Sequence, residues 1–479
     1  MPLTPGKEPY WATHDGRKVV SVHEPPYPVE GHGNDTFSNL SLATAILGVA
    51  APIPVLLDLP FTTLPTILAV TAAPTFVVYN YARAWIYGNY VATDDSKAPL
   101  PKKPIEEYLE FKDPALKRRF GGSKIPMELF FENYMDGKID IKGDVLDVLE
   151  HRHDWAVFRF SLGQATFLVS QWVPELLWHS KKQDETQVGE NYDRGNDFYN
   201  AFLGPTMTYT SGVVVDKTRK ETLEELQRNK YDLVLRKTLF DRPGLKHLDI
   251  GCGWGPLVIH AAKHFKTAES VGVTLAKNQV SWGNDWAARE GVSDVARLEV
   301  MDYRDIPTKY PGKKWDRITC LEMAEHVGVL RFQTFLRQIY DTLEDDGVFY
   351  MQVAGLRRTW QYEDFIWGLF MAKYIFPGAD ASTPLNWYLE QLERAGFEVQ
   401  STETMGTHYS ATLWRWYENW LSNRGSMVKA YGEKMARLWE IFLAWSTIIA
   451  RQGSATVYFI VAHKNKNGFD RTRFMPPRA

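Results

Sequence analysis

The chain has 479 residues, a formal net charge of −3 and two cysteines, Cys252 and Cys320. This length allows two or three domains, the near-neutral charge gives no electrostatic basis for nucleic-acid binding, and two cysteines cannot form a disulfide framework. Aromatic residues make up 14% of the chain, which suits either a large aromatic core or a surface that meets lipid.

Two uncharged stretches follow an N-terminal tail, residues 1–35, that mixes charge, proline and glycine. Residues 36–57 and 59–82 carry no charge, and each is long enough to cross a bilayer core of about 30 Å as a helix. We therefore predict a membrane hairpin of two hydrophobic helices over residues 36–90. Two spanning helices, one re-entrant hairpin in a single leaflet and two buried soluble helices are all compatible with this composition.

Aromatic and basic residues after these stretches indicate an orientation. Trp85, Tyr87 and Tyr90 are suited to an interfacial belt, and the lysines that follow favour a cytosolic location for the rest of the chain. Those lysines are Lys97, Lys102 and Lys103. We expect the protein in the endoplasmic reticulum membrane, with its larger domain in the cytosol.

Residues 91–187 are predicted to form a linker and a helical connecting region. Residues 94–104 are charged and proline-rich, as linkers are, and apolar residues recur at helical spacing within residues 143–180. His151 and His153 are two residues apart, which places them on different faces of a helix. Since no spacing in the chain resembles a structural zinc site, we expect no metal.

Residues 246–255 read K-H-L-D-I-G-C-G-W-G and predict a strand, a tight turn and the start of a helix. Glycines in such a turn permit positive φ and let a ligand lie against the backbone. The spacing is not the dinucleotide fingerprint G-x-G-x-x-G, and no P-loop lysine follows. An ordinary glycine-rich turn is the alternative on this stretch alone. The strand ending in Asp249 and its loop resemble the first motif of class I S-adenosylmethionine methyltransferases.

Further motifs narrow this resemblance. Residues 191–212 contain Y-D-R-G-N-D-F-Y and P-T-M-T-Y-T, and V-G-V-T-L-A-K-N-Q, D-Y-R-D-I and L-E-M-A-E-H-V-G follow in order. Together they resemble the cyclopropane fatty acid synthases and mycolic acid methyltransferases over residues 188–465. The resemblance implies an α/β class I methyltransferase domain with a Rossmann-like, seven-stranded, mostly parallel sheet. It also implies a helical lid insertion at about residues 356–450; residues 466–479 form a basic tail.

The resemblance implies S-adenosylmethionine as cofactor. Asp249 and the loop would hold its methionine part, Thr274 and Gln279 its ribose, and Tyr303 and Arg304 would flank its adenine. The implied cofactor-binding residues are Tyr192, Tyr209, Thr210, Leu248, Asp249, Gly251, Cys252, Gly253, Trp254, Gly255, Thr274, Leu275, Asn278, Gln279, Tyr303, Arg304 and Leu321.

Catalytic residues are also implied by the resemblance. Members of this family methylate unactivated alkenes in lipid chains, which leaves a carbocation that must lose a proton to a base. Glu325 and Tyr409 match residues that hold a bicarbonate ion acting as that base. The pocket that holds this ion is called the cradle below. Three of its positions differ from the cyclopropane synthases, since Ser211, Gln352 and Ser446 replace Cys, His and Cys. The altered cradle favours a methyl-branched product over a cyclopropane and leaves the role of bicarbonate open.

A hydrophobic hairpin joined to this domain resembles the fungal sphingolipid 9-methyltransferases. That resemblance implies methyl transfer to carbon 9 of a sphingoid base, at its 8,9 double bond, within ceramide or glucosylceramide. The alternatives are a membrane-bound cyclopropane or methyl-branched fatty acid synthase acting on phospholipid acyl chains, a head-group methyltransferase, and a non-catalytic lipid-binding scaffold. The resemblance implies a sphingolipid as substrate, and the hydrophobic hairpin predicts a membrane as partner. The sequence does not decide the oligomeric state.

Overall fold

The computed structural model describes residues 13–14, 17–18, 20–23, 39–86, 103–158, 161–172, 195–358, 361–377, 379 and 382–475. The chain divides into two compact units, which are described separately. The N-terminal unit contains Met1–Tyr10, Pro25–Glu175 and Thr359–Ile375. The sheet unit contains Trp11–Glu24, Leu176–Arg358 and Phe376–Ala479.

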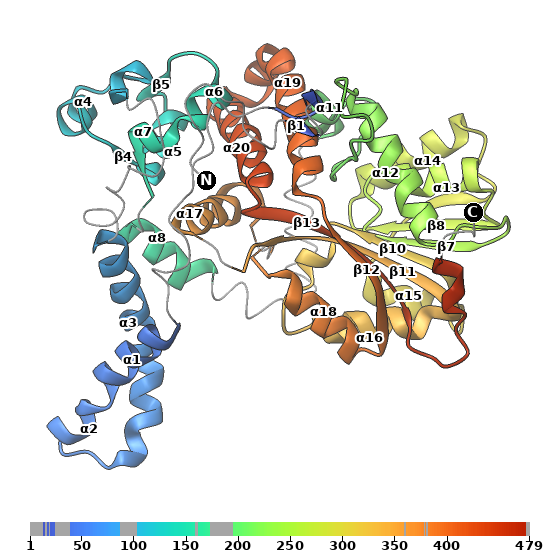
Figure 1. Cartoon of the computed structure of the whole chain (residues 1–479), viewed down its shortest axis with the longest axis horizontal. Coiled ribbons are helices and arrows are strands. Elements are labelled where there is room, and N and C mark those ends of the chain that lie inside the picture. Colours follow the sequence, from blue (N-terminus) through green and yellow to red (C-terminus); the bar gives the residue numbers. More distant parts are fainter. Residues whose placement is uncertain are drawn as a thin grey trace. The chain divides into compact units, whose positions relative to one another are not determined.

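A seven-stranded sheet in the order β12-β13-β11-β10-β7-β8-β9 forms the centre of the sheet unit (Figure 1). Only β13 runs antiparallel to its neighbours β11 and β12, while β7 to β11 pair in parallel. The predicted class I methyltransferase fold is therefore confirmed. The strands are β7 (Lys246–Ile250), β8 (Glu269–Thr274), β9 (Ala296–Val300), β10 (Trp315–Leu321), β11 (Leu343–Leu356), β12 (Phe397–Thr404) and β13 (Ala455–Lys464).

Both faces of this sheet are covered, as the strand sequences require. Successive side chains of a strand point to opposite faces. In β13, Tyr458, Ile460 and Ala462 join one buried core, and Val457, Phe459 and Val461 join another. A strand buried on both faces needs a near-continuous apolar run, which explains the sequence V-Y-F-I-V-A at residues 457–462 of β13.

Helices from either side supply the two cores. Side chains of α16 and α18 fill the first core, and side chains of α12 and α13 fill the second. The helices of this unit are α11 (Asn196–Leu203), α12 (Leu223–Lys237), α13 (Pro256–Phe265), α14 (Lys277–Arg289), η8 (Tyr303–Asp305), α15 (Ile306–Lys309), η9 (Ala324–His326), α16 (Phe332–Thr342), α18 (Leu385–Arg394), α19 (Gly406–Tyr431), α20 (Glu433–Arg451) and η11 (Arg471–Phe474). A short strand pair, β1 (Thr13–His14) and β2 (Arg17–Lys18), completes the unit.

The chain leaves β7 toward β8 and β9 and then returns to the other side of β7 as β10. The order of the strands thus reverses between β7 and β10. Open α/β sheets bind ligands at such a switch point, beyond the carboxyl ends of the strands. The predicted glycine loop lies at this point, between β7 and α13.

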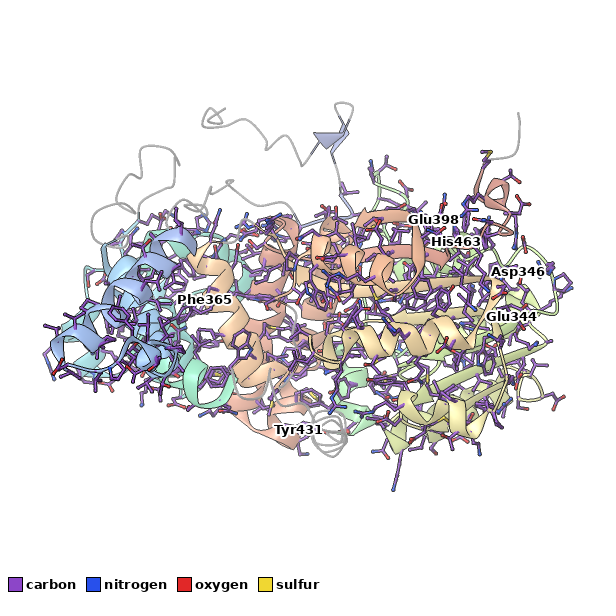
Figure 2. The ribbon with its side chains drawn as sticks, turned by 90° about the horizontal axis from the view of Figure 1, so that it is seen from below. Glu344, Asp346, Phe365, Glu398, Tyr431 and His463 are labelled. Atoms are coloured by element: carbon purple, nitrogen blue, oxygen red, sulfur yellow. The ribbon has the colours of Figure 1, made fainter. Side chains whose placement is uncertain are left out.

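The far edge of the sheet is formed by β12, which pairs with β13. Glu398 of β12 and His463 of β13 are register partners, with 3.8 Å between Oε2 and Nε2 (Figure 2). Strand β12 and helix α18 lie within residues 356–450, the range expected to form a lid. That range therefore includes part of the sheet and of its core as well as helices.

The apolar N-terminal stretches form helices in the N-terminal unit. Helix α1 (Asn39–Ala50) and α3 (Leu64–Ile86) lie side by side (Figure 1), and Ser41 near the start of α1 hydrogen-bonds Tyr79 near the end of α3. The two helices therefore run antiparallel, as a hairpin does. Between them lie α2 (Pro52–Leu56) and η3 (Phe61–Thr63).

Only one helix among the described residues is long and apolar enough to cross a membrane, and its apolar window is Phe61–Tyr79. The helix of the first stretch, residues 36–57, is also expected to be long enough to cross a membrane. It ends at Ala50 and resumes as a five-residue helix with prolines 52 and 54 in it, because proline lacks the N–H that continues a helix. The predicted belt residues Tyr87 and Tyr90, with Lys97 and Lys102, lie outside the described residues.

The rest of the N-terminal unit combines short strands and helices. Its elements are η6 (Ile105–Glu107), β3 (Leu109–Phe111), α4 (Pro114–Phe120), β4 (Ile125–Pro126), α5 (Met127–Met135), β5 (Ile139–Ile141), α6 (Val145–Glu150), α7 (Arg152–Trp155), β6 (Ala156–Val157), α8 (Leu162–Phe167), η7 (Leu168–Trp172), α17 (Tyr362–Phe370) and η10 (Met371–Ile375). The last two follow β11 in sequence, so the chain returns to this unit after the sheet's central strands.

A buried ion pair joins these distant segments. Arg152 of α7 makes a bidentate contact with the carboxylate of Glu363 in α17, in which Nη2 donates to Oε2 over 3.1 Å. Both residues are at most 4% exposed. Phe365, labelled in Figure 2, packs with Phe167 and Leu369 in an apolar cluster that also contains Phe76 of α3. Helix α17 is therefore part of the core of the N-terminal unit.

Candidate active site

A cavity lies beyond the carboxyl ends of four parallel strands of the sheet unit. Its walls come from the segments after β7, β8, β9 and β10 and from residues 207–210, which precede α12. Thirteen predicted residues line it: Tyr209, Thr210, Asp249, Gly251, Cys252, Gly253, Trp254, Thr274, Leu275, Gln279, Tyr303, Arg304 and Leu321. The sequence motifs thus converge at the topological switch point.

The glycine loop takes the backbone conformation that its sequence predicts. Gly251, Gly253 and Gly255 have φ of 79°, 54° and 79°, in the left-handed region that favours glycine. A Cβ atom on Gly251 would lie 2.5 Å from the side chain of Met323, whereas one on Gly253 would meet nothing within 4 Å. Gly251 therefore permits close packing, and Gly253 leaves open space in the cavity wall.

Polar side chains after β8 and β9 are held in place by their neighbours. Thr274 Oγ1 donates to Gln279 Oε1 over 2.8 Å, which joins the two residues expected at the ribose. Arg304 donates through Nε to Asp302 Oδ1 over 2.8 Å. Asp302 also lines the cavity, although the sequence analysis did not select it.

Four predicted cofactor residues are not in the cavity wall that the structure describes. Leu248 is fully buried in the core of the sheet, and a Cβ on Gly255 would lie 2.6 Å from Leu298, so both positions serve packing. Asn278 is exposed on the first turn of α14. Tyr192 lies outside the described residues, so its cofactor contact stays a prediction.

Glu322, which is not among the residues predicted from the sequence, is the centre of the hydrogen-bond network in this cavity. Its Oε1 accepts from Thr210 Oγ1 over 2.6 Å, from Ser211 N over 3.0 Å and from Gln352 Nε2. Its Oε2 accepts from Tyr409 OH over 2.9 Å. Both carboxylate oxygens therefore have donors, and the carboxylate lies at the cavity wall.

The predicted catalytic pair, Glu325 and Tyr409, occupies different places in this arrangement. Tyr409 donates to Glu322, and burial together with the nearby Glu322 charge raises the pKa of its hydroxyl well above its usual value. Glu325 is buried, and its Oε1 accepts from the backbone N–H of Ala354 at the end of β11. It lies near enough to Tyr409 to add to its pKa shift, but it is not in the cavity wall.

The three positions that depart from the cyclopropane synthases also differ in their surroundings. Ser211 contributes its backbone N–H and Gln352 its side-chain amide to Glu322. Ser446 is buried, and its hydroxyl has no hydrogen-bond partner among the residues that the structure describes. Two of the three substitutions therefore coincide with the network around Glu322.

One buried cation, Lys230 of α12, faces this group of acids. Lys230 is 1% exposed, lines the cavity, and makes no hydrogen bond to any described residue. Burial lowers the pKa of its ammonium to about 7, although the charges of Glu322 and Asp249 raise it in part. Burial raises the pKa of Asp249 to about 6, against the effect of Thr319, whose hydroxyl donates to Oδ1 over 2.6 Å.

Aromatic rings surround the part of the cavity wall that residues 207–210 form. Trp416, which is fully buried, has its ring centroid 5.3 Å from that of Tyr209 and 6.1 Å from that of Tyr409. Tyr199 contacts Tyr209 and Trp254, and Trp254 Nε1 donates to Asn196 Oδ1 over 2.8 Å. The N-D-F-Y motif in α11 thus supports the glycine loop through its side chains.

Two functional candidates, Glu322 and Lys230, were missed for identifiable reasons. Glu322 lies three residues before Glu325 in L-E-M-A-E-H, and the family resemblance assigns the catalytic role to the second acid. Lys230 lies in a helix segment rich in charges of both signs, E-E-L-Q-R-N-K-Y-D. This pattern is typical of a helix face that is exposed to solvent. Its position four residues after Leu226, a buried residue, was the available signal.

The family model of the mycolic acid cyclopropane synthetases matches residues 179–460 of the chain. A sphingolipid C9-methyltransferase of Komagataella phaffii is 48% identical over 467 residues, which are 95% of this chain and 93% of the relative. Sphingolipid C9-methyltransferase 1 of Gibberella zeae is 48% identical over 472 residues, which are 98% of this chain and 90% of the relative.

A solved structure matches the fold over a shorter range. The crystal structure of mycolic acid cyclopropane synthase CmaA1, complexed with SAH and CTAB, superimposes with a TM-score of 0.54 at 26% identity. The match covers 58% of this chain and 98% of that one. The sphingolipid relatives therefore match a much larger share of this chain than the solved cyclopropane synthase does.

Proposed function

The chain belongs to the mycolic acid cyclopropane synthetase family, and we propose that it transfers a methyl group from S-adenosylmethionine to carbon 9 of a sphingoid base. The acceptor is the 8,9 double bond of the base in ceramide or glucosylceramide. One observation carries the proposal: identity of 48% to a sphingolipid C9-methyltransferase extends over 95% of this chain. A match of that extent has to include most of the N-terminal unit, which is the part expected to meet the lipid.

The residues of the cavity fit the cofactor. S-adenosylmethionine carries an ammonium and a carboxylate at one end, and supplies an electrophilic methyl group on a sulfonium. Asp249 and the glycine loop would hold the ammonium end, and Lys230 would take the carboxylate, since its buried ammonium has no hydrogen bond to a described residue. Thr274 and Gln279 would meet the ribose, and Tyr303 with Asp302 and Arg304 would line the adenine end.

The same cavity suits methyl transfer to an alkene. An alkene is a weak nucleophile, so the two reacting carbons must be held close and in line. The resulting carbocation needs an environment that excludes water and stabilises positive charge. The aromatic faces of buried Trp416 and of half-buried Tyr209 and Tyr409 suit this, and the carboxylates of Glu322 and Glu325 add negative charge nearby.

We further propose that the hairpin of the N-terminal unit lies in the endoplasmic reticulum membrane and that the sheet unit is cytosolic. Large apolar side chains of the hairpin are exposed, among them Val55, Leu56, Phe61, Val70 and Val78 at 64 to 77%. Exposed apolar surface of this extent marks a contact with lipid or protein. Lys97, Lys102 and Lys103 follow the hairpin and support the cytosolic orientation.

Reconstitution with defined lipids tests the proposed reaction. The purified full-length chain is incubated in mixed micelles with methyl-labelled S-adenosylmethionine and either ceramide, glucosylceramide or a monounsaturated phospholipid. Both sphingolipids carry an 8,9 double bond, and a ceramide without it is the matched control. We expect label at carbon 9 of the base in at least one sphingolipid and none in the control. Label in the phospholipid acyl chain or in a head group would contradict the proposal.

Mass alone cannot identify the product, because a methyl branch and a cyclopropane each add one CH2 to the lipid. Proton NMR separates them, since a cyclopropane has ring protons at high field and a 9-methyl base retains its alkene. We expect the retained alkene.

A further inference from the structure

Glu322 has a backbone conformation that L-residues rarely adopt. Its φ is 52°, in the left-handed region, although it is neither glycine nor asparagine. A residue held in this region is strained, and such outliers concentrate at functional sites. Strand β10 ends at Leu321, so this conformation places Glu322 directly beyond the carboxyl end of the strand, where it lines the cavity.

Four donors then fix the direction of its carboxylate. Thr210 Oγ1, Ser211 N and Gln352 Nε2 donate to one oxygen, and Tyr409 OH donates to the other. They come from the segment before α12, from β11 and from α19, far apart in the sequence. A carboxylate held by this many groups has little freedom to turn away from the cavity.

The neighbouring groups are less suited to accept a proton. Tyr409 already directs its hydroxyl proton to Glu322. Glu325 is not in the cavity wall and accepts from the backbone of Ala354. Asp249 accepts from Thr319 and lies in the glycine-loop wall, beside the expected ammonium of the cofactor. Lys230 would bind the cofactor carboxylate as an ammonium, and in that form it has no lone pair to accept a proton.

We infer that Glu322 is the general base of the reaction and removes the proton from the methylated carbon. The inference rests on the proposed function, since it requires an alkene acceptor. In this assignment a carboxylate of the chain itself takes the place of the bicarbonate ion that the family resemblance implies as the base. It also explains one of the substitutions in the cradle, because the side-chain amide of Gln352 is one of the groups that hold this carboxylate.

The electron pair of the 8,9 double bond forms the new bond from carbon 9 to the methyl group, while the S–C pair stays on sulfur. Carbon 8 is then left with a positive charge. Glu322 takes the proton of carbon 9, and the freed C–H pair re-forms the 8,9 double bond. The products are a 9-methyl base, S-adenosylhomocysteine and a protonated Glu322, which returns its proton to water as the products leave. A proton next to a carbocation is strongly acidic, so a hydrogen-bonded carboxylate is a sufficient base.

Three full-length variants test this assignment. Glu322→Gln keeps the size of the side chain but removes its ability to take a proton. Glu322→Gly suits the positive φ and leaves room for a small carboxylate such as formate or bicarbonate. Glu344→Gln is the matched control, since Glu344 lies on β11 (Figure 2) and does not line the cavity. Turnover, S-adenosylhomocysteine affinity by calorimetry and melting temperature are measured for each.

We expect Glu322→Gln to lose at least about 100-fold in turnover, as removal of a general base does, with affinity for S-adenosylhomocysteine within about threefold of wild type. Formate or bicarbonate should restore turnover in Glu322→Gly and leave Glu344→Gln and wild type unaffected. With a substrate deuterated at carbon 9, the wild-type product should have lost the deuterium.

Three results would overturn the assignment: near-normal turnover of Glu322→Gln, equal loss of cofactor affinity and turnover without rescue of Glu322→Gly, or a product that retains deuterium at carbon 9. Failure of the proposed function is distinguishable, because wild type itself would then leave the sphingoid base unlabelled.

Discussion

The two units of the chain distribute charge and apolar surface in opposite ways. The sheet unit places four charged side chains at or near a cavity, with Lys230, Asp249 and Glu325 buried and Glu322 half-buried. The hairpin of the N-terminal unit instead exposes valine, leucine and phenylalanine side chains. Burial of charge is costly unless partners or function compensate, and exposure of apolar surface is costly in water. Each unit therefore carries a feature that a simple soluble domain would avoid.

The difference assigns separate tasks to the two units. Buried charges and aromatic rings suit chemistry on a cation away from water, and an exposed apolar hairpin suits residence in lipid. Among the described residues of the N-terminal unit, Arg152 and Glu363 form a buried charge pair, which joins two segments 211 residues apart in the chain. In that unit buried charge is structural.

Gly253→Asp should have the largest effect, and it affects the sheet unit. The substitution puts a carboxylate with an unfavourable positive φ into the cavity wall near Asp249, so we expect cofactor affinity to fall by more than about 1,000-fold. Gly244→Asp is the control, because Gly244 has a φ of 83° and open space around it but lies outside the cavity. Calorimetry with S-adenosylhomocysteine measures both. Equal affinities for the two variants would remove the glycine loop from the site.

Arg152→Met should have the next largest effect, on the N-terminal unit alone. Loss of one partner from a buried ion pair costs about 3–5 kcal/mol because the other charge stays buried. We expect faster amide hydrogen exchange in residues 103–172 and 361–375 and unchanged exchange in β7 and α13. Arg118→Met, at an exposed position of the same unit, should change neither. If the amides of α17 exchange as slowly in the variant as in wild type, the ion pair does not hold this helix in place.

Val70→Glu tests the role of the exposed apolar hairpin. An acidic residue in the middle of a membrane helix costs about 3 kcal/mol, so we expect the variant to shift from the membrane pellet to the soluble fraction after alkaline extraction. Val215→Glu is matched in chemistry and exposure, at 67% against 69%, but lies in the sheet unit. Equal retention of both variants in the pellet would mean that α3 is not the anchor.

Lys230→Met tests the buried cation of the sheet unit. Loss of a hydrogen bond to a charged group costs about 1.5–3 kcal/mol, so we expect a 10- to 150-fold loss of S-adenosylhomocysteine affinity. The pKa of Lys230 is about 7, and only its protonated form attracts a carboxylate. Wild-type affinity should therefore be highest below pH 7 and fall as the pH rises above it, and the variant should lack this slope. Lys237→Met, on the same helix outside the cavity, is the control.

Glu325→Gln should have the smallest effect. Its amide retains an acceptor for Ala354 N but removes a charge near Tyr409, so we expect about tenfold lower turnover with normal cofactor affinity. A loss as large as that of Glu322→Gln would make Glu325 the stronger candidate for the base.

A local strand–turn–helix pattern predicted the glycine loop, and the family resemblance predicted the sheet and half of the residues in the cavity wall. Asp249, Gly251 and Gly253 were found because strand, turn and helix start follow one another within ten residues. Lys230 and Glu322 were not, because their importance depends on segments distant in sequence, such as Gln352 and Tyr409 for Glu322. The return of α17 to the N-terminal unit depends on Arg152, about 210 residues earlier, and no local pattern marks it.

The proposed methyl transfer is tested most directly by lipid mass spectrometry with fragmentation, in cells with and without this protein that are fed methyl-labelled methionine. We predict label at carbon 9 of sphingoid bases, only in cells that contain the protein. Label in ordinary fatty acyl chains, with unlabelled sphingoid bases, would contradict the proposed substrate.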